Sequence, residues 1–176
     1  MSRTSPDAKF IPLNVAVVTI SDTRTADDDG SGDYLAASLE QEGHHVVRRM
    51  IVKDDRYVLR AEFSALIADD EVSIVLSTGS TGLTGRDVAP EALEPLFDKT
   101  IEGFGELFRQ ASVTDIGAAT IQSRAFAGLA NGTVMFCMPG SPNACRTAWE
   151  EIIRPQLDAR TRPCNLANLM PRFREV

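Results

Sequence analysis

The chain has few of the residues that build disulfide networks and zinc sites. Its three cysteines, Cys137, Cys145 and Cys164, are odd in number and far apart, so we expect reduced thiols. The two histidines, His44 and His45, are adjacent, which does not match the ligand spacing of ordinary zinc sites. The sequence therefore argues against a domain stabilised by disulfides or zinc.

Basic residues are outnumbered, and long apolar runs are missing. With 25 acidic and 18 basic residues, the formal net charge is -7, which argues against a nucleic-acid or anionic-membrane partner. A small phosphorylated ligand stays compatible with this charge, because local cations can offset it. No apolar run approaches the roughly 20 residues of a transmembrane helix, and the N-terminus lacks the plan of a signal peptide. We therefore expect a soluble, cytoplasmic protein.

What the sequence does contain is an alternation of apolar runs and helical patterns. Nearly continuous apolar runs at 14–20, 72–77 and 133–138 are typical of strands covered on both faces, and 45–52 is a fourth predicted strand. Helices are predicted at 32–42, 55–69 and 90–97, on the face Ile101, Phe104, Leu107 and Phe108, and from Ser141 and Pro142 to Pro155. Residues 116–128 show neither period. The alternation predicts an α/β fold, a sandwich around a mostly parallel sheet.

The chain length suits one domain. We expect a flexible N-terminal arm over residues 1–12, an α/β domain over 13–165 and a C-terminal tail over 166–176. Prolines after Ala159 predict irregular structure towards that end. No internal repeat or interdomain linker is recognisable.

Three loops rich in small and hydroxylated residues leave predicted strands at the same end. In open α/β sheets, ligands bind beyond the carboxyl ends of the strands, and small residues let backbone N–H groups approach an anion. The Gly79-x-x-Gly82-x-x-Gly85 spacing matches neither the P-loop nor the dinucleotide fingerprint. The pattern therefore favours an anion site over turn chemistry alone, without naming the anion. The loops are residues 21–24, 78–82 and 139–142.

Two carboxylates flank these loops, and each has two interpretations. Asp87 could simply lie near the start of a helix, where the helix dipole favours a negative charge. Alternatively, it could hold Mg2+ against phosphate oxygens. Asp54 could cap the helix at 55–69, or it could share that metal role. Arg86, Ser123 and Arg124 are either candidate phosphate clamps or ordinary surface residues. Ser31-Gly32 is most simply a helix N-cap, whose helix terminus could itself face an anion.

Several motifs together resemble a known family. The sequence from Thr78 to Gly82, followed by Arg86-Asp87 and Pro90-Glu91-Ala92, is similar to the T-G-G-T-G…D…P-E-A signature of the MoaB/MogA family of molybdenum cofactor biosynthesis proteins. The segment 138–142 resembles the second signature of that family. Further similarity to its B branch lies at 43–47, 122–125, 145–150 and 155–165. The resemblance covers residues 10–165.

The resemblance implies a three-layer α/β/α sandwich, homotrimers or homohexamers, and molybdopterin as substrate or ligand. It also implies adenylylation, in which the terminal phosphate of molybdopterin attacks the α-phosphorus of MgATP and pyrophosphate leaves. Asp54 and Asp87 match the essential acidic residues, which we interpret as Mg2+ ligands. The positions that match pterin- and nucleotide-binding residues are Ser21, Asp22, Asp29, Ser31, Gly32, Thr78, Gly79, Ser80, Thr81, Gly82, Ser123, Arg124, Pro139, Gly140, Ser141 and Pro142.

Two residues depart from the family pattern. Ser80 replaces the middle glycine, which predicts that this residue needs neither a positive φ nor the closest backbone approach. Lys53 stands where the catalytic relatives carry proline. The leading hypothesis is a molybdopterin adenylyltransferase. One alternative is a protein that binds molybdopterin or its precursor without turnover, as membership in the B branch favours. Another is an unrelated small-phosphate enzyme.

Overall fold

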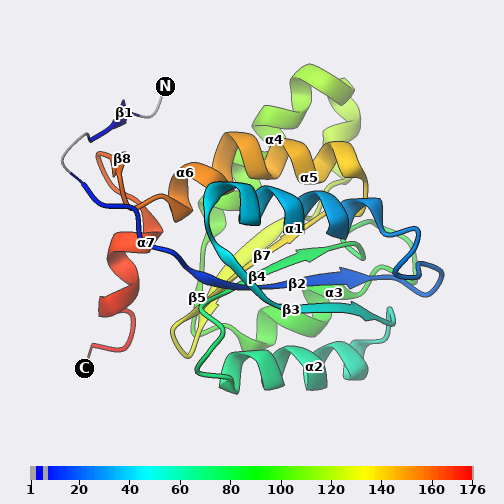
Figure 1. Cartoon of the computed structure of the whole chain (residues 1–176). Coiled ribbons are helices and arrows are strands. Elements are labelled where there is room, and N and C mark those ends of the chain that lie inside the picture. Colours follow the sequence, from blue (N-terminus) through cyan, green and yellow to red (C-terminus); the bar gives the residue numbers. More distant parts are fainter. Residues whose placement is uncertain (1–2, 6–7, 176) are drawn as a thin grey trace.

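A mixed six-stranded sheet lies between two layers of helices in the computed structural model, which describes residues 3–5 and 8–175 (Figure 1). The strand order is β3-β2-β4-β7-β6-β5, and β1 and β8 form a separate two-stranded pair. The predicted three-layer α/β/α fold with a mostly parallel sheet is confirmed. The strands are β1 Arg3–Thr4, β2 Asn14–Ile20, β3 His45–Val52, β4 Ile74–Thr78, β5 Lys99–Thr100, β6 Phe126–Ala130, β7 Thr133–Met138 and β8 Thr161–Arg162.

Helices α1, α4 and α5 cover one face of the sheet, and α2 and α3 cover the other (Figure 1). The α-helices are α1 Gly30–Glu42, α2 Arg56–Ala68, α3 Ala89–Leu93, α4 Glu102–Ile116, α5 Pro142–Ala148, α6 Arg154–Leu157 and α7 Leu166–Leu169. The 3-10 turns are η1 Glu94–Leu96, η2 Gly117–Gln122 and η4 Met170–Arg172, and η3 Trp149–Ile153 is a π-helical turn.

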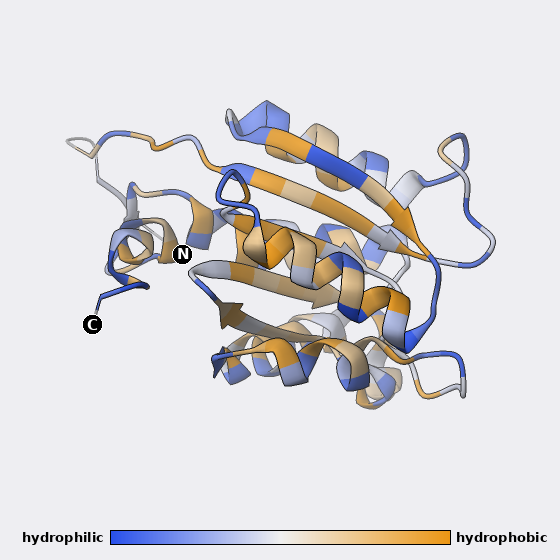
Figure 2. Ribbon diagram, turned by 90° about the horizontal axis from the view of Figure 1, so that it is seen from below, coloured by the Kyte–Doolittle hydropathy of each residue, from blue (hydrophilic) through white to orange (hydrophobic). Residues whose placement is uncertain are grey.

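The central strands are apolar on both sides because each face packs against helices. In β2, Val15 and Val17 belong to the cluster beneath α1, α4 and α5, whereas Ala16 and Val18 belong to the cluster above α2 and α3. Figure 2 shows this as hydrophobic strands between helices that carry one hydrophobic and one hydrophilic side. Such burial on both faces explains why the strands were recognisable as continuous apolar runs.

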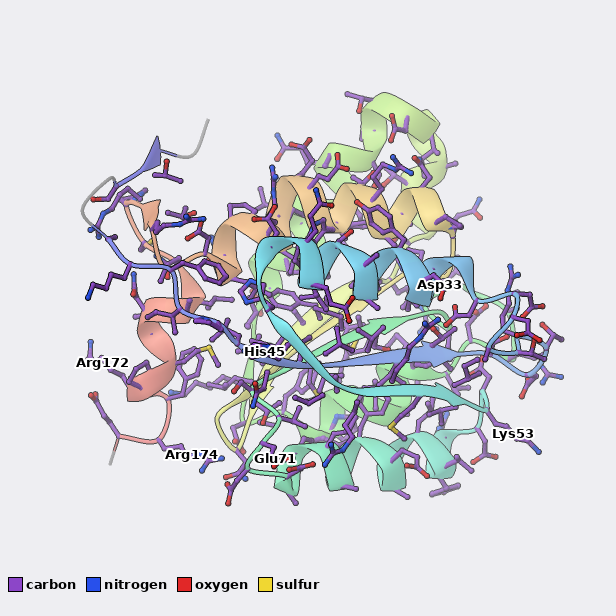
Figure 3. All side chains as sticks on the ribbon, viewed as in Figure 1. Asp33, His45, Lys53, Glu71, Arg172 and Arg174 are labelled. Carbon is purple, nitrogen blue, oxygen red and sulfur yellow. The ribbon has the colours of Figure 1, made fainter. Side chains whose placement is uncertain are left out.

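The strand directions bring three loops to one edge of the sheet. Strands β3, β2, β4 and β7 run parallel to one another, and β6 is antiparallel to both β7 and β5. The carboxyl ends of the four parallel strands therefore meet at one edge, at the right in Figure 3, where Lys53 follows β3. His45, at the start of β3, lies at the opposite edge.

Pro155 does not end the last long helix, so that prediction is wrong. The chain continues from α5 through η3 into α6 and stops at Leu157. In η3, the Arg154 N–H donates to the Trp149 carbonyl, which widens the turn by one residue. Pro155 then lies in the first turn of α6, where a missing N–H is tolerated.

The C-terminal segment is also more regular than predicted. After β8, the helix α7 and the turn η4 place Leu166, Met170 and Phe173 against the core, and Ala167 is buried. Asn165 begins α7, since its side chain accepts from the Asn168 N–H at 2.8 Å. Apolar residues at helical spacing thus outweigh the effect of the prolines.

Parts of the predicted N-terminal arm and of the unassigned segment 116–128 form regular structure. Strand β1 pairs with β8, while residues 1, 2, 6 and 7 of the predicted arm, and residue 176 of the predicted tail, lie outside the described residues. The segment 116–128 contains η2 and most of β6. The helix predicted over 90–97 is α3 followed by η1. Within the described ranges, no helix is long and apolar enough to cross a membrane.

Candidate active site

The loops after β2, β4 and β7 come together at the carboxyl edge of the sheet. The Gly79 N–H donates to the Met138 carbonyl at 2.9 Å, and the Thr78 hydroxyl donates to the Pro139 carbonyl at 3.0 Å. Gly79 has φ +106°, and a Cβ there would overlap the Ile20 carbonyl at the end of β2. Only glycine fits this contact, so the loop begins under a strict steric constraint.

Ser80 contradicts the expectation that it needs no positive φ. Its φ is +59°, in the left-handed region that costs a non-glycine residue about 1 kcal/mol. The hydroxyl compensates by accepting from the Val88 and Ala89 N–H groups at 2.8 and 2.9 Å, and by donating to Asp54 Oδ1 at 2.6 Å. Three hydrogen bonds therefore hold a conformation that glycine would adopt without strain.

Asp54 is not the cap of the following helix. Asp55 caps α2, because its carboxylate accepts from the Tyr57 and Val58 N–H groups. The half-buried Asp54 instead faces Ser80. Burial raises the pKa of Asp54, the Ser80 hydrogen bond offsets part of that increase, and the nearby negative charge of Asp87 raises the pKa further. The net shift is upward.

Asp87 lies in a turn that is rich in hydrogen-bond donors. Its Oδ2 accepts from the Thr84 N–H at 2.8 Å and from the Thr84 hydroxyl at 2.6 Å. Burial alone would raise the pKa of Asp87. The Thr84 donors, the Gly82 N–H and the positive charge of Arg124 outweigh that effect and lower the pKa. Gly82 is constrained here, since a Cβ would lie 2.7 Å from Asp87 Oδ2.

The two carboxylates fit a Mg2+ ion that completes its shell elsewhere. Mg2+ is usually bound in proteins by one or two carboxylates together with waters and substrate phosphates. Ser80 connects the two segments, since its hydroxyl donates to Asp54 and accepts from the N–H of Val88, the residue after Asp87. Within residues 3–5 and 8–175, no group of three or more His, Cys, Asp and Glu side chains could hold a metal ion. Two carboxylates alone would leave most of the Mg2+ shell to water and to substrate phosphates.

Arg124 holds the glycine-rich loop by contacts within the protein. Its Nε and Nη2 donate to the Gly82 and Asp87 carbonyls, both at 2.8 Å, and its Nη1 pairs with Glu91. These contacts place a fixed positive charge beside Asp87 while using much of the donor capacity of the guanidinium. The Ser123 hydroxyl accepts from the Ala125 N–H. Arg86 forms an ion pair with Asp22.

The predicted first binding loop supplies both structural and accessible groups. Asp29, rather than Ser31-Gly32, is the N-cap of α1, which corrects that interpretation. The buried Asp29 carboxylate accepts from the Gly32 N–H at 3.0 Å and from the Thr19 hydroxyl at 2.8 Å. Capping therefore starts the helix two residues before the predicted position. Ser21 organises its own turn, because its Oγ accepts from the Thr23 and Arg24 N–H groups.

The loop over residues 139–142 connects to the first loop and begins α5. The Ser31 hydroxyl donates to the Gly140 carbonyl at 2.9 Å. Ser141 is the predicted N-cap, since its side chain accepts from the Ala144 N–H at 3.2 Å. Gly140, Ser141 and Pro142 are exposed and border the edge where the other loops meet. The predicted site residues therefore gather in one region, with Ser123 and Arg124 on the β6 side.

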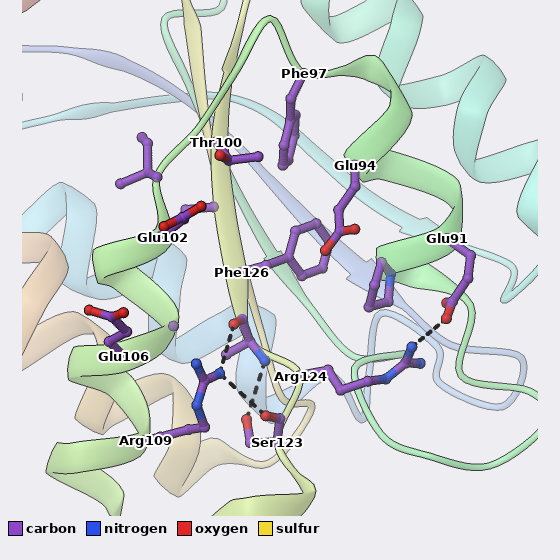
Figure 4. Close-up of a pocket in the computed structure, with 15 residues that line it drawn as sticks. Glu91, Glu94, Phe97, Thr100, Glu102, Glu106, Arg109, Ser123, Arg124 and Phe126 are labelled. Atoms are coloured by element: carbon purple, nitrogen blue, oxygen red, sulfur yellow. Dashed lines mark hydrogen bonds and ion pairs between the residues drawn. The ribbon is translucent and has the colours of Figure 1, made fainter.

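Sequence reasoning missed Thr84 and the acid that pairs with Arg124. Thr84 stands three residues before Asp87, a spacing at which a turn can bond hydroxyl to carboxylate. In the sequence, Glu91 is recognisable only as part of the Pro90-Glu91-Ala92 signature. It lines a pocket of about 630 Å³ together with Ser123 and Arg124, and Phe97 and Phe126 contribute aromatic walls (Figure 4). Asp54 and Asp87 do not line this pocket.

The site sequence lies within a region that matches one family model. Residues 16–159 match the family described as "Probable molybdopterin binding domain". The chain belongs to the MoaB/MogA family. Its relative in Escherichia coli K12, molybdenum cofactor biosynthesis protein B, is 59% identical over 165 residues, which cover 94% of this chain and 96% of that protein. The resemblance inferred from the motifs is confirmed.

Solved MoaB structures share the fold. The crystal structure of a molybdenum cofactor biosynthesis protein B is 43% identical, with a TM-score of 0.81 over 84% of this chain and 92% of that one. The tungsten cofactor synthesizing protein MoaB from Pyrococcus furiosus is 34% identical, with a TM-score of 0.75 over 97% of this chain and all of that one. The matched MoaB/MogA region contains every predicted site residue from Ser21 to Pro142.

Proposed function

We propose that this MoaB/MogA member binds molybdopterin within residues 13–165 and transfers AMP from MgATP to its terminal phosphate. The observation that carries the proposal is the placement of Asp54 and Asp87 beside a glycine-rich loop at the carboxyl edge of the sheet. Membership in the family indicates that the ligand is a pterin. The two carboxylates are the reason to expect a metal-dependent reaction at a phosphate.

The proposed reaction needs positioning and charge neutralisation more than proton transfer. A terminal phosphate oxygen of molybdopterin bonds to the α-phosphorus of ATP while the bond to the β-phosphate oxygen breaks, giving adenylyl-molybdopterin and pyrophosphate. Since the attacking phosphate is already an anion, no general base is required. When bound, Mg2+ would neutralise charge on the phosphates. Asp54 and Asp87 would hold it, and the loops would orient the pterin phosphate.

The lowered pKa of Asp87 supports its role as a metal holder. A carboxylate that stays ionised is available to a cation over a wide pH range, and the Thr84 donors contact Oδ2 specifically. Arg124 fixes the Gly82 and Asp87 carbonyls, so the backbone on both sides of the turn is held. The geometry thus suits a pre-positioned carboxylate.

Pyrophosphate release from purified protein, molybdopterin, ATP and Mg2+ tests this proposal. We expect turnover with the wild-type protein, and Asp87→Ala should reduce it by at least about 100-fold, as for loss of a preorganised electrostatic group. Asp55→Ala is a matched control, because the Asp55 carboxylate caps α2 by accepting from the Tyr57 and Val58 N–H groups. A pterin-binding protein without ATP turnover would contradict the enzyme and leave a binding role. The similarity to molybdenum cofactor biosynthesis protein B favours that alternative.

We also propose that the protein self-associates as a homotrimer or homohexamer. Large apolar side chains on α4 and η2 are more than half exposed in the single chain, and they include Leu107 and Ile121. Contiguous exposed apolar residues mark protein interfaces. Light scattering at micromolar concentration should give a multiple of three subunits, and a monomer would contradict the proposal.

A further inference from the structure

Ser80 combines a strained backbone with a fully used hydroxyl. The residue is buried, at 8% exposure, and it lies between the end of β4 and the turn that leads to α3. Its Oγ contacts three groups: the Val88 N–H at 2.8 Å, the Ala89 N–H at 2.9 Å and Asp54 Oδ1 at 2.6 Å. The Ala89 N–H also donates to the Ser80 carbonyl at 3.1 Å.

The direction of these hydrogen bonds follows from what each group can donate. A hydroxyl has one hydrogen and two lone pairs. The N–H groups of Val88 and Ala89 can only donate, so they occupy both lone pairs. The single hydroxyl hydrogen must therefore point to Asp54 Oδ1. No donor or acceptor capacity of Ser80 remains for a phosphate or a metal ion.

We propose that Ser80 is a positioning residue that fixes the Asp54 carboxylate for cation binding and does not itself bind the ligand. This inference rests on the proposed Mg2+ site at Asp54 and Asp87. The backbone anchors the hydroxyl at two points, and the hydroxyl in turn donates to one oxygen of Asp54, so that the position of this carboxylate is fixed. The positive φ directs the side chain to this position, so the strain at Ser80 serves the alignment of Asp54.

The competing explanation is that Ser80 only holds the loop. Its two bonds to the Val88 and Ala89 N–H groups would then matter, and its bond to Asp54 would not. Outer residues that orient metal ligands typically contribute about 10-fold to 100-fold in metal affinity. If Ser80 acted on the loop alone, Ser80→Ala should weaken metal binding by the same factor whether or not Asp54 is present.

Binding of Mn2+ alone, measured by the loss of the free-ion signal in electron paramagnetic resonance, tests the proposal; ATP is left out because it binds Mn2+ itself. We expect Ser80→Ala and Ser80→Gly to weaken Mn2+ binding by about 10-fold. Glycine removes the backbone strain as well as the hydroxyl, so equal losses would assign the effect to the hydroxyl. In an Asp54→Ala background, Ser80→Ala should cause no further loss. Wild-type affinity in Ser80→Gly, or additive losses in the double variant, would overturn the proposal.

Crystal structures of the wild type and Ser80→Gly separate this inference from the proposed function. We expect the Asp54 carboxylate to rotate or occupy several conformations in Ser80→Gly while the loop backbone keeps its course. An unchanged Asp54 carboxylate would overturn the positioning role even if the enzyme is active. Absence of Mn2+ binding by the wild-type protein would instead overturn the metal site of the proposed function, whatever the position of Asp54.

Discussion

Asp54 and Asp87 are the same residue type in neighbouring positions, yet their surroundings shift their pKa values in opposite directions. Asp54 has burial and one hydroxyl donor, and the charge of Asp87 opposes its ionisation. Asp87 has the Thr84 and Gly82 donors and the field of Arg124. The difference shows that a turn with well-placed donors stabilises a carboxylate, whereas proximity to a glycine-rich loop alone does not.

Removing Arg124 should have the largest effect on stability. Arg124→Ala breaks two hydrogen bonds to backbone carbonyls and the ion pair with Glu91, so we expect the free energy of unfolding to fall by about 2–3 kcal/mol. Chemical denaturation measures this change. Arg109→Ala is the control, since its two carbonyl contacts are both 3.5 Å and a smaller loss is expected. Equal losses would remove the special role of Arg124.

Asp87→Asn should destabilise the protein by about 1–2 kcal/mol at neutral pH, because the charge that the Thr84 donors stabilise is lost. The folded-state pKa of Asp87 is lowered, so its contribution is present above the unfolded value near about 3.9 and disappears as the pH falls through the folded value. Chemical denaturation of both proteins at pH 7, and again at a pH below the folded pKa of Asp87, checks this. A difference that persists unchanged in acid would contradict the electrostatic explanation.

Asp54→Asn should have the opposite sign. Because the folded pKa of Asp54 is raised, the folded protein binds its proton more readily, and ionisation at higher pH costs stability. Asparagine keeps an oxygen that can accept from Ser80 without carrying the charge, so we expect a gain of less than about 1 kcal/mol at pH 7. Unfolding curves of Asp54→Asn and Asp87→Asn, measured under the same conditions, test this contrast. A loss of stability in both variants would contradict it.

Asp55→Ala should have the smallest effect on turnover. The variant removes the cap from α2, so a small fall in Tm is expected, with pyrophosphate release unchanged. Calorimetry and the turnover assay together check this, with Asp54→Ala as the matched neighbour. Loss of turnover in Asp55→Ala would contradict the assignment of Asp55 as a helix cap and Asp54 as the metal ligand.

The strands and the site edge were predictable because their physical causes are local. Burial on both faces made β2, β4 and β7 continuous apolar runs, and parallel strands necessarily present their loops together. Ser80 was not predictable, because its positive φ depends on partners 8, 9 and 26 residues away. The same applies to Arg124, whose carbonyl partners lie 37 and 42 residues away.

The predicted effects of proline are wrong at Pro155 and in the segment after Ala159. Pro155 is accommodated because η3 shifts it into a first helical turn. The segment after Ala159 is ordered because Leu166, Ala167 and Met170 pack in or against the hydrophobic core. In both cases packing determined the local structure, which a residue-by-residue reading of helix-breaking tendency cannot anticipate.

The hydrogen bonds that join Thr78, Gly79 and Ser31 to the end of β7 and the loop after it affect how quickly a ligand can associate. Since these loops are already connected to one another, little chain ordering has to accompany binding, and the entropic penalty of association is correspondingly small. Association should then proceed in a single kinetic phase whose rate rises linearly with ligand concentration, as expected for a binding surface that is formed before the ligand arrives.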